Sequence, residues 1–175
     1  MPYVLLDSSL LSIISTPSNR NESFQCRNWV KQLILNDIAV AVPAVIDYEL
    51  RRVLLQGGKT PGLENLNQLQ ETGLQYVEMS QRMWIKAAEL WAWARNSNQS
   101  TANADKIDID CLLAAQAIVI SELSGEHTIV ATKNVKDIAR YTPAKTWEET
   151  TVEYFKKTNP ALVSARVPIR RIAQS

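Results

Sequence analysis

The chain has 175 residues, of which 46% are apolar and 21% charged, and its formal net charge is +1 at pH 7. This composition is that of a globular domain and excludes a disordered or low-complexity chain. The length favours one domain with a sizeable core, and a net charge near zero argues against coating nucleic acid by bulk positive charge, while leaving a local site open.

Several residue types that build other kinds of site are scarce. The two cysteines, Cys26 and Cys111, form no CxxC pair, and His127 is the only histidine. A zinc finger, a Cys–His protease and a disulfide scaffold are therefore disfavoured. No basic region follows Met1, Asp7 lies within the first apolar run, and no apolar run approaches the roughly 20 residues that span a bilayer. We therefore expect a soluble, cytoplasmic protein without a membrane partner.

Short apolar runs and helical patterns alternate along the chain. Strands are expected at residues 3–6, 38–42, 74–77, 128–131 and 144–147. Helices are expected at residues 8–14, about 24–34, 43–55, 63–71, 81–95, 108–121 and in a short turn ending near 140. Strands that alternate with helices in this way predict an α/β fold, with a mainly parallel sheet covered by helices on both faces.

Some side chains have a predicted place in these elements. Ser8 and Ser9 are candidate N-caps of the first helix. On the helix at 81–95, Trp84 and Trp91 share one side with three alanines, so we expect both to pack in the core. Trp93 lies off that stripe, and there it could meet a partner or stack on a base.

Polar side chains follow the predicted strands, where a parallel sheet opens a crevice for ligands. They are Asp7, Ser8, Glu49, Asp108, Asp110, Thr132, Asn134 and Asp137. Carboxylates gathered at one place repel one another and take up protons unless a divalent cation compensates their charge. A carboxylate set without His or Cys suits Mg²⁺ or Mn²⁺ better than zinc, and such a metal can activate a water for attack on a phosphodiester.

Four sequence motifs carry a family resemblance. They are VLLDSSLLS at 4–12, AVPAVIDYELRRVLL at 41–55, DIDCLLAAQA at 108–117 and IVATKNVKDI at 129–138. In order and spacing they resemble the four motifs of the PIN-domain nucleases, in particular the VapC-like bacterial toxins. The resemblance implies a three-layer α/β/α sandwich, metal-dependent cleavage of single-stranded or looped RNA, and dimerisation or binding of a cognate antitoxin.

The resemblance also assigns roles to residues. The four acids that match the family's catalytic and metal-binding positions are Asp7, Glu49, Asp110 and Asp137. The small polar neighbours that match its substrate-binding positions are Ser8, Thr132 and Asn134. The implied cofactor is Mg²⁺ or Mn²⁺. The motifs extend to about residue 147, which predicts a PIN-like domain over 1–150 and a basic C-terminal extension over 151–175.

Two pairs of acids leave alternatives open. Asp108 and Asp110 are two positions apart and cannot share a helix face, so one is expected as the N-cap and the other as the ligand, and the motif favours Asp110. Asp47 competes with Glu49, the motif favours Glu49, and Asp47 would then be a solvated helix residue. Asp137 alone would be read as an ordinary first-turn acid, and it becomes a site candidate only through the other three.

The lysines beside the acidic motifs, the histidine and Cys111 can be explained without a role in the site. Lys106, Lys133 and Lys136 adjoin the acidic motifs and could hold RNA phosphates, although each is equally well explained as a surface lysine. His127 is expected to be a surface histidine with its hydrogen bonds satisfied, and Cys111 a buried structural thiol.

Other function classes fit the residues less well. A haloacid-dehalogenase-like phosphatase needs a second acid two residues after Asp7, where this chain has Ser9. A dinucleotide-binding domain needs a glycine-rich turn at that place, and a receiver domain needs a second acid. The remaining alternative is a PIN-like module that binds RNA or protein without cleaving, whose mark would be loss of the acids.

Overall fold

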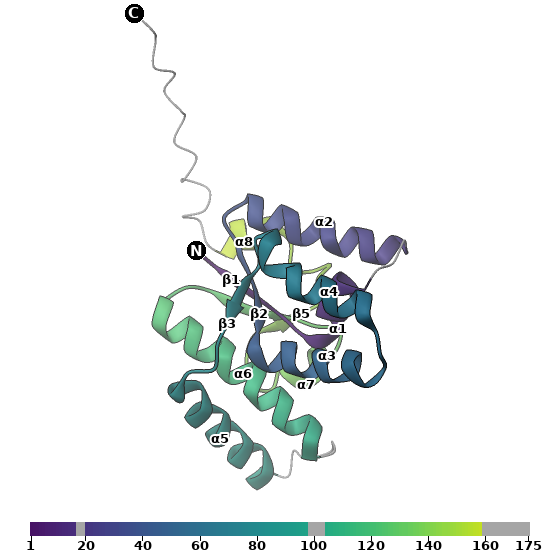
Figure 1. The fold of residues 1–175 in the computed structure, drawn as a ribbon. Helices are drawn as coiled ribbons and strands as arrows, with labels where there is room; N and C mark the ends of the chain where they lie inside the picture. The colour runs from purple at the N-terminus through teal and green to yellow at the C-terminus, as the bar shows by residue number, and fades with distance from the viewer. Residues whose placement is uncertain (17–19, 98–103, 159–175) are drawn as a thin grey trace, which may run out of the picture.

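The computed structural model of the chain describes residues 1–16, 20–97 and 104–158, with the side chains of 70 and 104–107 excepted (Figure 1). Within these ranges one sheet of five strands has the order β3-β2-β1-β4-β5, and every neighbouring pair is parallel. The strands are β1 (Tyr3–Leu6), β2 (Ala39–Pro43), β3 (Gln75–Val77), β4 (Thr128–Ala131) and β5 (Ala144–Lys145). The predicted parallel sheet is confirmed.

Helices connect the strands as the sequence pattern predicts. The described helices are α1 (Ser8–Ser15), α2 (Asn21–Leu35), α3 (Ala44–Gln56), α4 (Thr60–Gln68), the 3₁₀ turn η1 (Leu69–Thr72), α5 (Gln81–Asn96), α6 (Ala104–Ser124), α7 (Val135–Ile138) and α8 (Val152–Thr158). None of them is both long enough and apolar enough to cross a membrane. Gly125 ends α6 with φ +68°, a backbone region that other residues rarely adopt.

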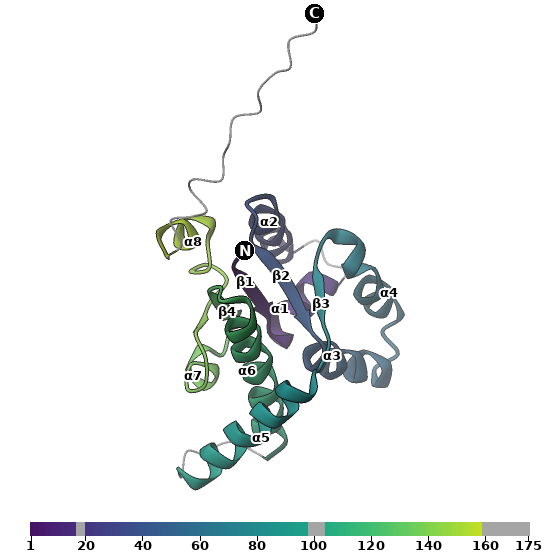
Figure 2. The ribbon, with the colours of Figure 1, turned by 90° about the vertical axis from the view of Figure 1, so that its left-hand side faces the viewer.

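The helices form a layer on each side of the sheet. Helix α6 packs against β4, and α5 lies along the outer side of α6 (Figure 2). On the opposite side, α2 packs against β2, and α1 contacts α2, α3 and α4. This arrangement is the predicted three-layer α/β/α sandwich.

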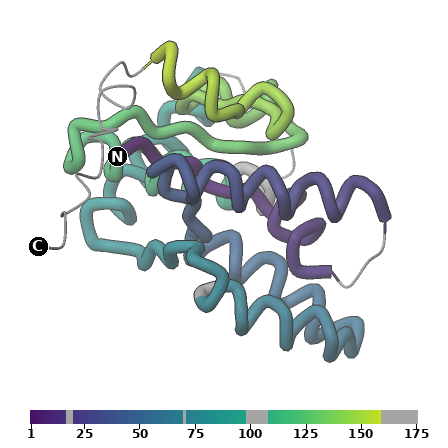
Figure 3. The backbone as a smooth tube through the Cα atoms, turned by 90° about the horizontal axis from the view of Figure 1, so that it is seen from above, coloured from purple at the N-terminus to yellow at the C-terminus, as the bar shows by residue number. Residues whose placement is uncertain are grey.

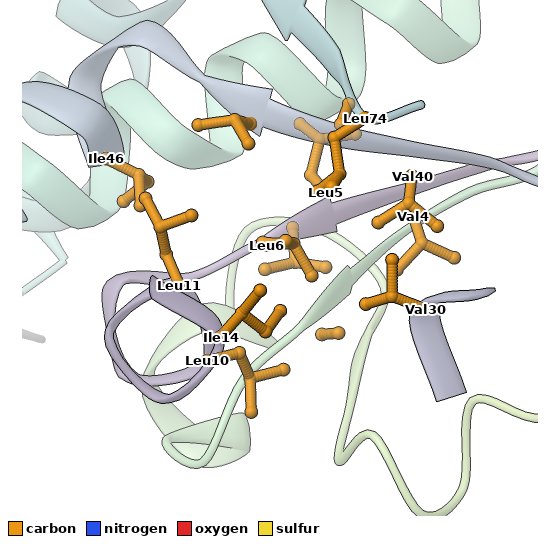
Figure 4. Close-up of a cluster of buried hydrophobic side chains, with 14 of the residues drawn as sticks. Val4, Leu5, Leu6, Leu10, Leu11, Ile14, Val30, Val40, Ile46 and Leu74 are labelled. Atoms are coloured by element: carbon orange, nitrogen blue, oxygen red, sulfur yellow. The ribbon is translucent and has the colours of Figure 1, made fainter. Parts of the chain in front are cut away.

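The core lies mainly between the sheet and the layer that holds α1 and α2. Strands β1 and β2 are buried almost throughout, as expected for central strands of a parallel sheet. Figure 4 shows side chains of β1, such as Leu6, meeting Leu10 and Ile14 of α1 and Val30 of α2. Close packing of apolar side chains is the main favourable contribution to folding here.

The last described segment also belongs to this core. Phe155 of α8 is fully buried in the main hydrophobic cluster. Before α8, the Trp29 indole N–H of α2 donates to the Thr150 carbonyl oxygen at 2.7 Å, and the Trp29 and Trp147 rings lie 6.0 Å apart. Trp29 of α2 and Val152 of α8 line the same pocket, and Figure 3 shows the yellow C-terminal segment along one edge of the molecule seen from above. The predicted basic extension thus begins with a packed helix, and its residues 159–175 lie outside the described part of the chain.

Three local predictions are wrong. The N-cap of α1 is Asp7, whose side chain accepts the Ser8 N–H, because the acid directly precedes the first helical residue. Helix α6 begins at Ala104, so Asp108 lies inside the helix and is not its N-cap. Trp84 and Trp91 are 55% and 40% exposed, because α5 packs mainly on α6, through small residues such as Ala87.

His127 is half-buried between β4 and α8, where its ring lies 2.9 Å from the Tyr154 hydroxyl, rather than on the open surface. Burial lowers the pKa of His127 below its usual 6.5. The unfolded chain therefore binds the proton more readily, and the stability contributed by neutral His127 is lost as pH falls below about 6.5.

We predict that the melting temperature falls between pH 7.5 and pH 5.5, and that His127→Gln reduces this fall. Glutamine leaves a polar partner for Tyr154 and cannot take up the proton. Thermal unfolding followed by circular dichroism at both pH values measures the effect. An identical pH dependence in the two proteins would contradict it, since the chain has only one histidine.

Candidate functional site

Two polar residues leave the sheet side by side. In the parallel pairing of β1 with β4, Leu6 is the partner of Ala131, so the next residues, Asp7 and Thr132, are adjacent. The Asp7 N–H donates to the Ala131 carbonyl oxygen at 3.0 Å. The Thr132 hydroxyl donates to Asp7 Oδ2 at 2.6 Å. The chain turns to opposite sides of β1 to form β2 and β4, so this contact lies at the topological switch point, where open α/β sheets bind ligands.

The Asp7 carboxylate is held by several donors. Its Oδ1 accepts the Ser8 backbone N–H at 2.7 Å, and its Oδ2 accepts the Ser9 hydroxyl at 3.3 Å as well as the Thr132 hydroxyl. All of these groups stabilise an ionised carboxylate. Their directions fix the side chain at the start of α1, half-exposed at the carboxyl end of the sheet.

The fourth motif folds into a second hydrogen-bonded group beside the first. The Asn134 N–H donates to the Thr132 hydroxyl oxygen at 2.9 Å, and the Asn134 side-chain amide donates to Asp137 Oδ2 at 2.6 Å. Arg140 lies 3.7 Å from the other Asp137 oxygen. Thr132 therefore links Asp7 to the segment that carries Asn134 and Asp137.

Glu49 and Asp47 occupy different environments on α3. Asp47 is buried, and its two oxygens accept from the Arg51 guanidinium at 2.9 Å each, while Arg51 also donates to Asn67 of α4. Asp47 is thus a buried ion-pair residue rather than a solvated one. Glu49 is half-buried, and its Oε2 is buried with no hydrogen-bond partner among the residues that the structure describes. A buried carboxylate oxygen without a donor is costly, and a ligand or cation would relieve that cost.

Asp110 lies half-buried in α6, and Asp108 is exposed. The Tyr141 hydroxyl donates to the Cys111 sulfur, and burial, followed by the charges of Cys111 and Asp110, raises the pKa of Tyr141 to about 12. Burial also raises the pKa of Cys111 to about 11, so it is a neutral structural thiol at neutral pH, as expected. Asp110 therefore lies close enough to Tyr141 to act on its hydroxyl.

These elements converge at one end of the sheet. Figure 2 shows α3, α7 and the N-terminal half of α6 at the end where β1 and β2 finish. Hydrogen bonds join Asp7 to Thr132 and Asn134 to Asp137, whereas no such contact joins Glu49 to Asp7. Among the residues that the structure describes, no three His, Cys, Asp or Glu side chains form a group that could hold a metal ion. The four-acid metal site thus stays a prediction.

The chemistry of the donors nevertheless fits Mg²⁺ or Mn²⁺. The available groups are carboxylate and hydroxyl oxygens, which these cations prefer, and the unpartnered oxygen of Glu49 is of this kind. Mg²⁺ is commonly held through one or two carboxylates, with waters and substrate phosphates completing its coordination. A site of this kind does not need three acids in mutual contact.

The sequence analysis missed two residues that the structure places here. Ser9 donates to Asp7 and accepts the Lys133 N–H at 3.3 Å, and its position in the Asp-Ser-Ser run could have indicated this role. Tyr141 had no sequence signal. Of the lysines considered, Lys133 forms an ion pair with Glu22, Lys136 is exposed, and the Lys106 side chain lies outside the described residues.

Comparison with known proteins finds solved structures of similar fold. No family model and no curated protein matches the sequence. Among solved structures, the chain is similar to one in VapBC2 from Rickettsia felis bound to a promoter DNA fragment, with a TM-score of 0.64, 17% identity, and coverage of 84% of this chain and 99% of that one. A chain of VapBC-1 from nontypeable Haemophilus influenzae matches with a TM-score of 0.56 and 12% identity, over 85% of this chain and 99% of that one. A chain of DNA-bound VapBC from Salmonella typhimurium matches with a TM-score of 0.54 and 15% identity, over 84% of this chain and 99% of that one. The chain thus shares the fold of a chain in each of these VapBC complexes, in agreement with the fold expected from the motifs.

We predict that Thr132→Val destabilises the chain by about 1–3 kcal/mol, because it removes the donor to Asp7 and the acceptor for the Asn134 N–H at a buried position. Thr128→Val is the matched control, since Thr128 is also buried but makes only a 3.4 Å hydrogen bond to the Glu126 carbonyl oxygen. Urea unfolding of both variants measures the difference. Equal losses of stability would show that the Asp7–Thr132 contact contributes nothing.

Proposed function

We propose that the chain is a metal-dependent endoribonuclease that cleaves single-stranded or looped RNA and acts as the toxin of a toxin–antitoxin pair. The observation that carries this proposal is the 2.6 Å contact between Asp7 and Thr132 at the switch point of the sheet. It joins the first and fourth motifs, 125 positions apart, into one polar site. The fold shared with chains of VapBC complexes supports the same interpretation.

In this proposal Asp7, Glu49 and Asp110 hold Mg²⁺ or Mn²⁺, and Asp137 supports them. When bound, such a cation lowers the pKa of a water and stabilises the charge that develops on a phosphodiester under attack. In the part of the chain that the structure describes, Glu49 Oε2 has no hydrogen-bond donor, so in this proposal it would complete the coordination of the cation or orient a water bound to it.

The protein's other residues orient these groups. Ser8, Ser9 and Thr132 fix the Asp7 carboxylate through their donors, so it needs no rearrangement when substrate binds. Asn134 holds Asp137 in the same way. Lys136 is exposed on the helix that carries Asp137, where its charge can attract the RNA backbone towards an otherwise acidic site.

The alternative is a PIN-like module that binds RNA or protein without cleaving it. Loss of the acids would mark such a module, and Asp7, Glu49, Asp110 and Asp137 are all present in this sequence. This observation favours cleavage, and the assay below separates the two.

We predict that the wild type cleaves a structured RNA in Mg²⁺ or Mn²⁺, and that Asp7→Asn or Asp110→Asn lowers the rate by about 10²-fold or more while leaving the fold intact. Asn keeps the size of the side chain and removes its charge. The assay follows a labelled RNA with each metal and with EDTA. Asp108→Asn distinguishes Asp108 from Asp110 and should keep most activity.

Asp37→Asn is the matched control, because Asp37 lies in the turn before β2 with φ +58°, a conformation that Asn tolerates. Thermal melts with and without Mn²⁺ accompany the assay, since a cation that binds the folded state raises its melting temperature. Cleavage that survives both Asp7→Asn and EDTA would refute the mechanism. A Mn²⁺-stabilised protein that cleaves no RNA would favour the binding module.

We further propose an antitoxin partner, a homodimer and a cytoplasmic location. A groove of about 450 Å³ between α1, α2 and the α4–η1 segment combines apolar side chains with two cations. Its apolar lining includes Ile14, Val30 and Leu74, and its cations are Arg27 and Lys31. This chemistry suits an antitoxin segment with apolar and acidic side chains, because both kinds of surface are then complemented. On α5, exposed Trp84 and Ile85 offer an apolar surface for a second copy.

We predict that Lys31→Glu weakens binding of the antitoxin encoded next to this chain, since a reversed charge repels an acidic segment. Lys59→Glu is the control, because Lys59 is also exposed and lies outside the groove. Co-expression followed by titration of the purified partner measures the affinity. Equal affinities of the two variants would place the partner elsewhere.

A further inference from the structure

The three tryptophans of α5 lie in two different places. Trp84 and Trp91 line an open groove of about 390 Å³ between α5 and α6, together with Asp108 and Leu112. Trp93, in the last turn of α5, is 46% exposed and is not part of this groove. Its ring instead meets that of Tyr141 edge to face, with centroids 5.9 Å apart and an interplanar angle of 77°.

Tyr141 connects Trp93 to the candidate site. Its hydroxyl donates to the buried Cys111 sulfur and feels the charge of Asp110, the residue before Cys111. Tyr141 also follows Arg140, which contacts Asp137. Tyr141 thus orients the indole of Trp93. Tyr141 itself lies beside Cys111, which follows Asp110, and next to Arg140, which contacts Asp137.

The aromatic ring of Trp93 can bind an RNA base, which the carboxylates of the candidate site cannot do. Carboxylates repel the RNA backbone, so a contact that does not depend on charge adds to the attraction that Lys136 and a bound cation would supply. Stacking on an aromatic face is independent of charge and accepts any base. Edge-to-face contact with Tyr141 fixes the indole, which lowers the entropy cost of stacking.

We propose that Trp93 is a substrate-binding residue that stacks on an unpaired base of the RNA beside the site of cleavage. The proposal rests on the proposed ribonuclease function and adds a residue that binds the substrate through its bases rather than its phosphates. In this proposal Trp93 binds RNA, whereas Trp84 belongs to the apolar surface proposed to bind a second copy of the chain.

The test measures binding of a short labelled oligoadenylate, and of the same oligomer with abasic sites, to chains that carry Asp7→Asn to prevent cleavage. Trp93→Ala should weaken binding of the oligoadenylate about tenfold, as expected for one lost stacked base. It should leave binding of the abasic oligomer unchanged. Trp93→Phe should restore part of the affinity, and the slope of affinity against salt should stay the same, since no phosphate contact is lost.

Trp84→Ala is the matched control, because Trp84 is an exposed tryptophan of the same helix and should not affect RNA affinity. Sedimentation of each variant reports self-association. An equal loss for both oligomers, or no loss, would overturn the role of Trp93 while leaving the ribonuclease proposal intact. A shift of Trp93→Ala towards monomer with unchanged RNA affinity would assign Trp93 to a contact between copies. Absence of oligoadenylate binding by the Asp7→Asn parent would overturn the role of Trp93, and wild-type cleavage of the structured RNA decides the ribonuclease proposal separately.

Discussion

Leu6 and Ala131 are partners in the parallel pairing of β1 with β4, and the residues that follow them therefore leave the sheet together. The rest of the candidate site depends on this register. A shift by one residue would send Asp7 and Thr132 to opposite faces of the sheet and separate their side chains. The pairing continues past the strand ends, because the Asp7 N–H donates to the Ala131 carbonyl oxygen, and both strands are almost wholly buried.

A partly buried ion pair stabilises helix α3, which carries Glu49. Asp47 and Arg51 hold successive turns of α3 together, and Arg51 extends the link to Asn67 on α4. With Asp47 satisfied in this way, Glu49 carries the buried carboxylate oxygen that has no partner. The two acids of one motif thus lie in different surroundings: Asp47 is held by Arg51, whereas Glu49 Oε2 has no hydrogen-bond partner among the described residues.

Much of the fold was predictable from the sequence, because the patterns that indicate strands and helices are local. The strands and the parallel sheet follow from apolar runs and the alternation of elements, whereas the preference for Glu49 over Asp47 rests on the family resemblance of the motif and stays a prediction. The exposure of Trp84 and Trp91 was not predictable, because a helical stripe indicates which residues share a side and not how much of that side a neighbour covers. Tyr141 was missed for a related reason, since its contacts to Trp93 and Cys111 bring together α5, α6 and the turn after α7.

The order in which the strands appear along the chain has a consequence during synthesis. Strand β1 is made first, but its neighbour β4 follows more than a hundred residues later, and Asp7 and Thr132 are 125 positions apart. Contacts of such long range form late in folding, because a large loop must close first. Phe155, which completes the core, is made later still. A nascent chain on the ribosome therefore lacks the Asp7–Thr132 pair, and with it the polar site that this pair holds together, until most of the chain has been made.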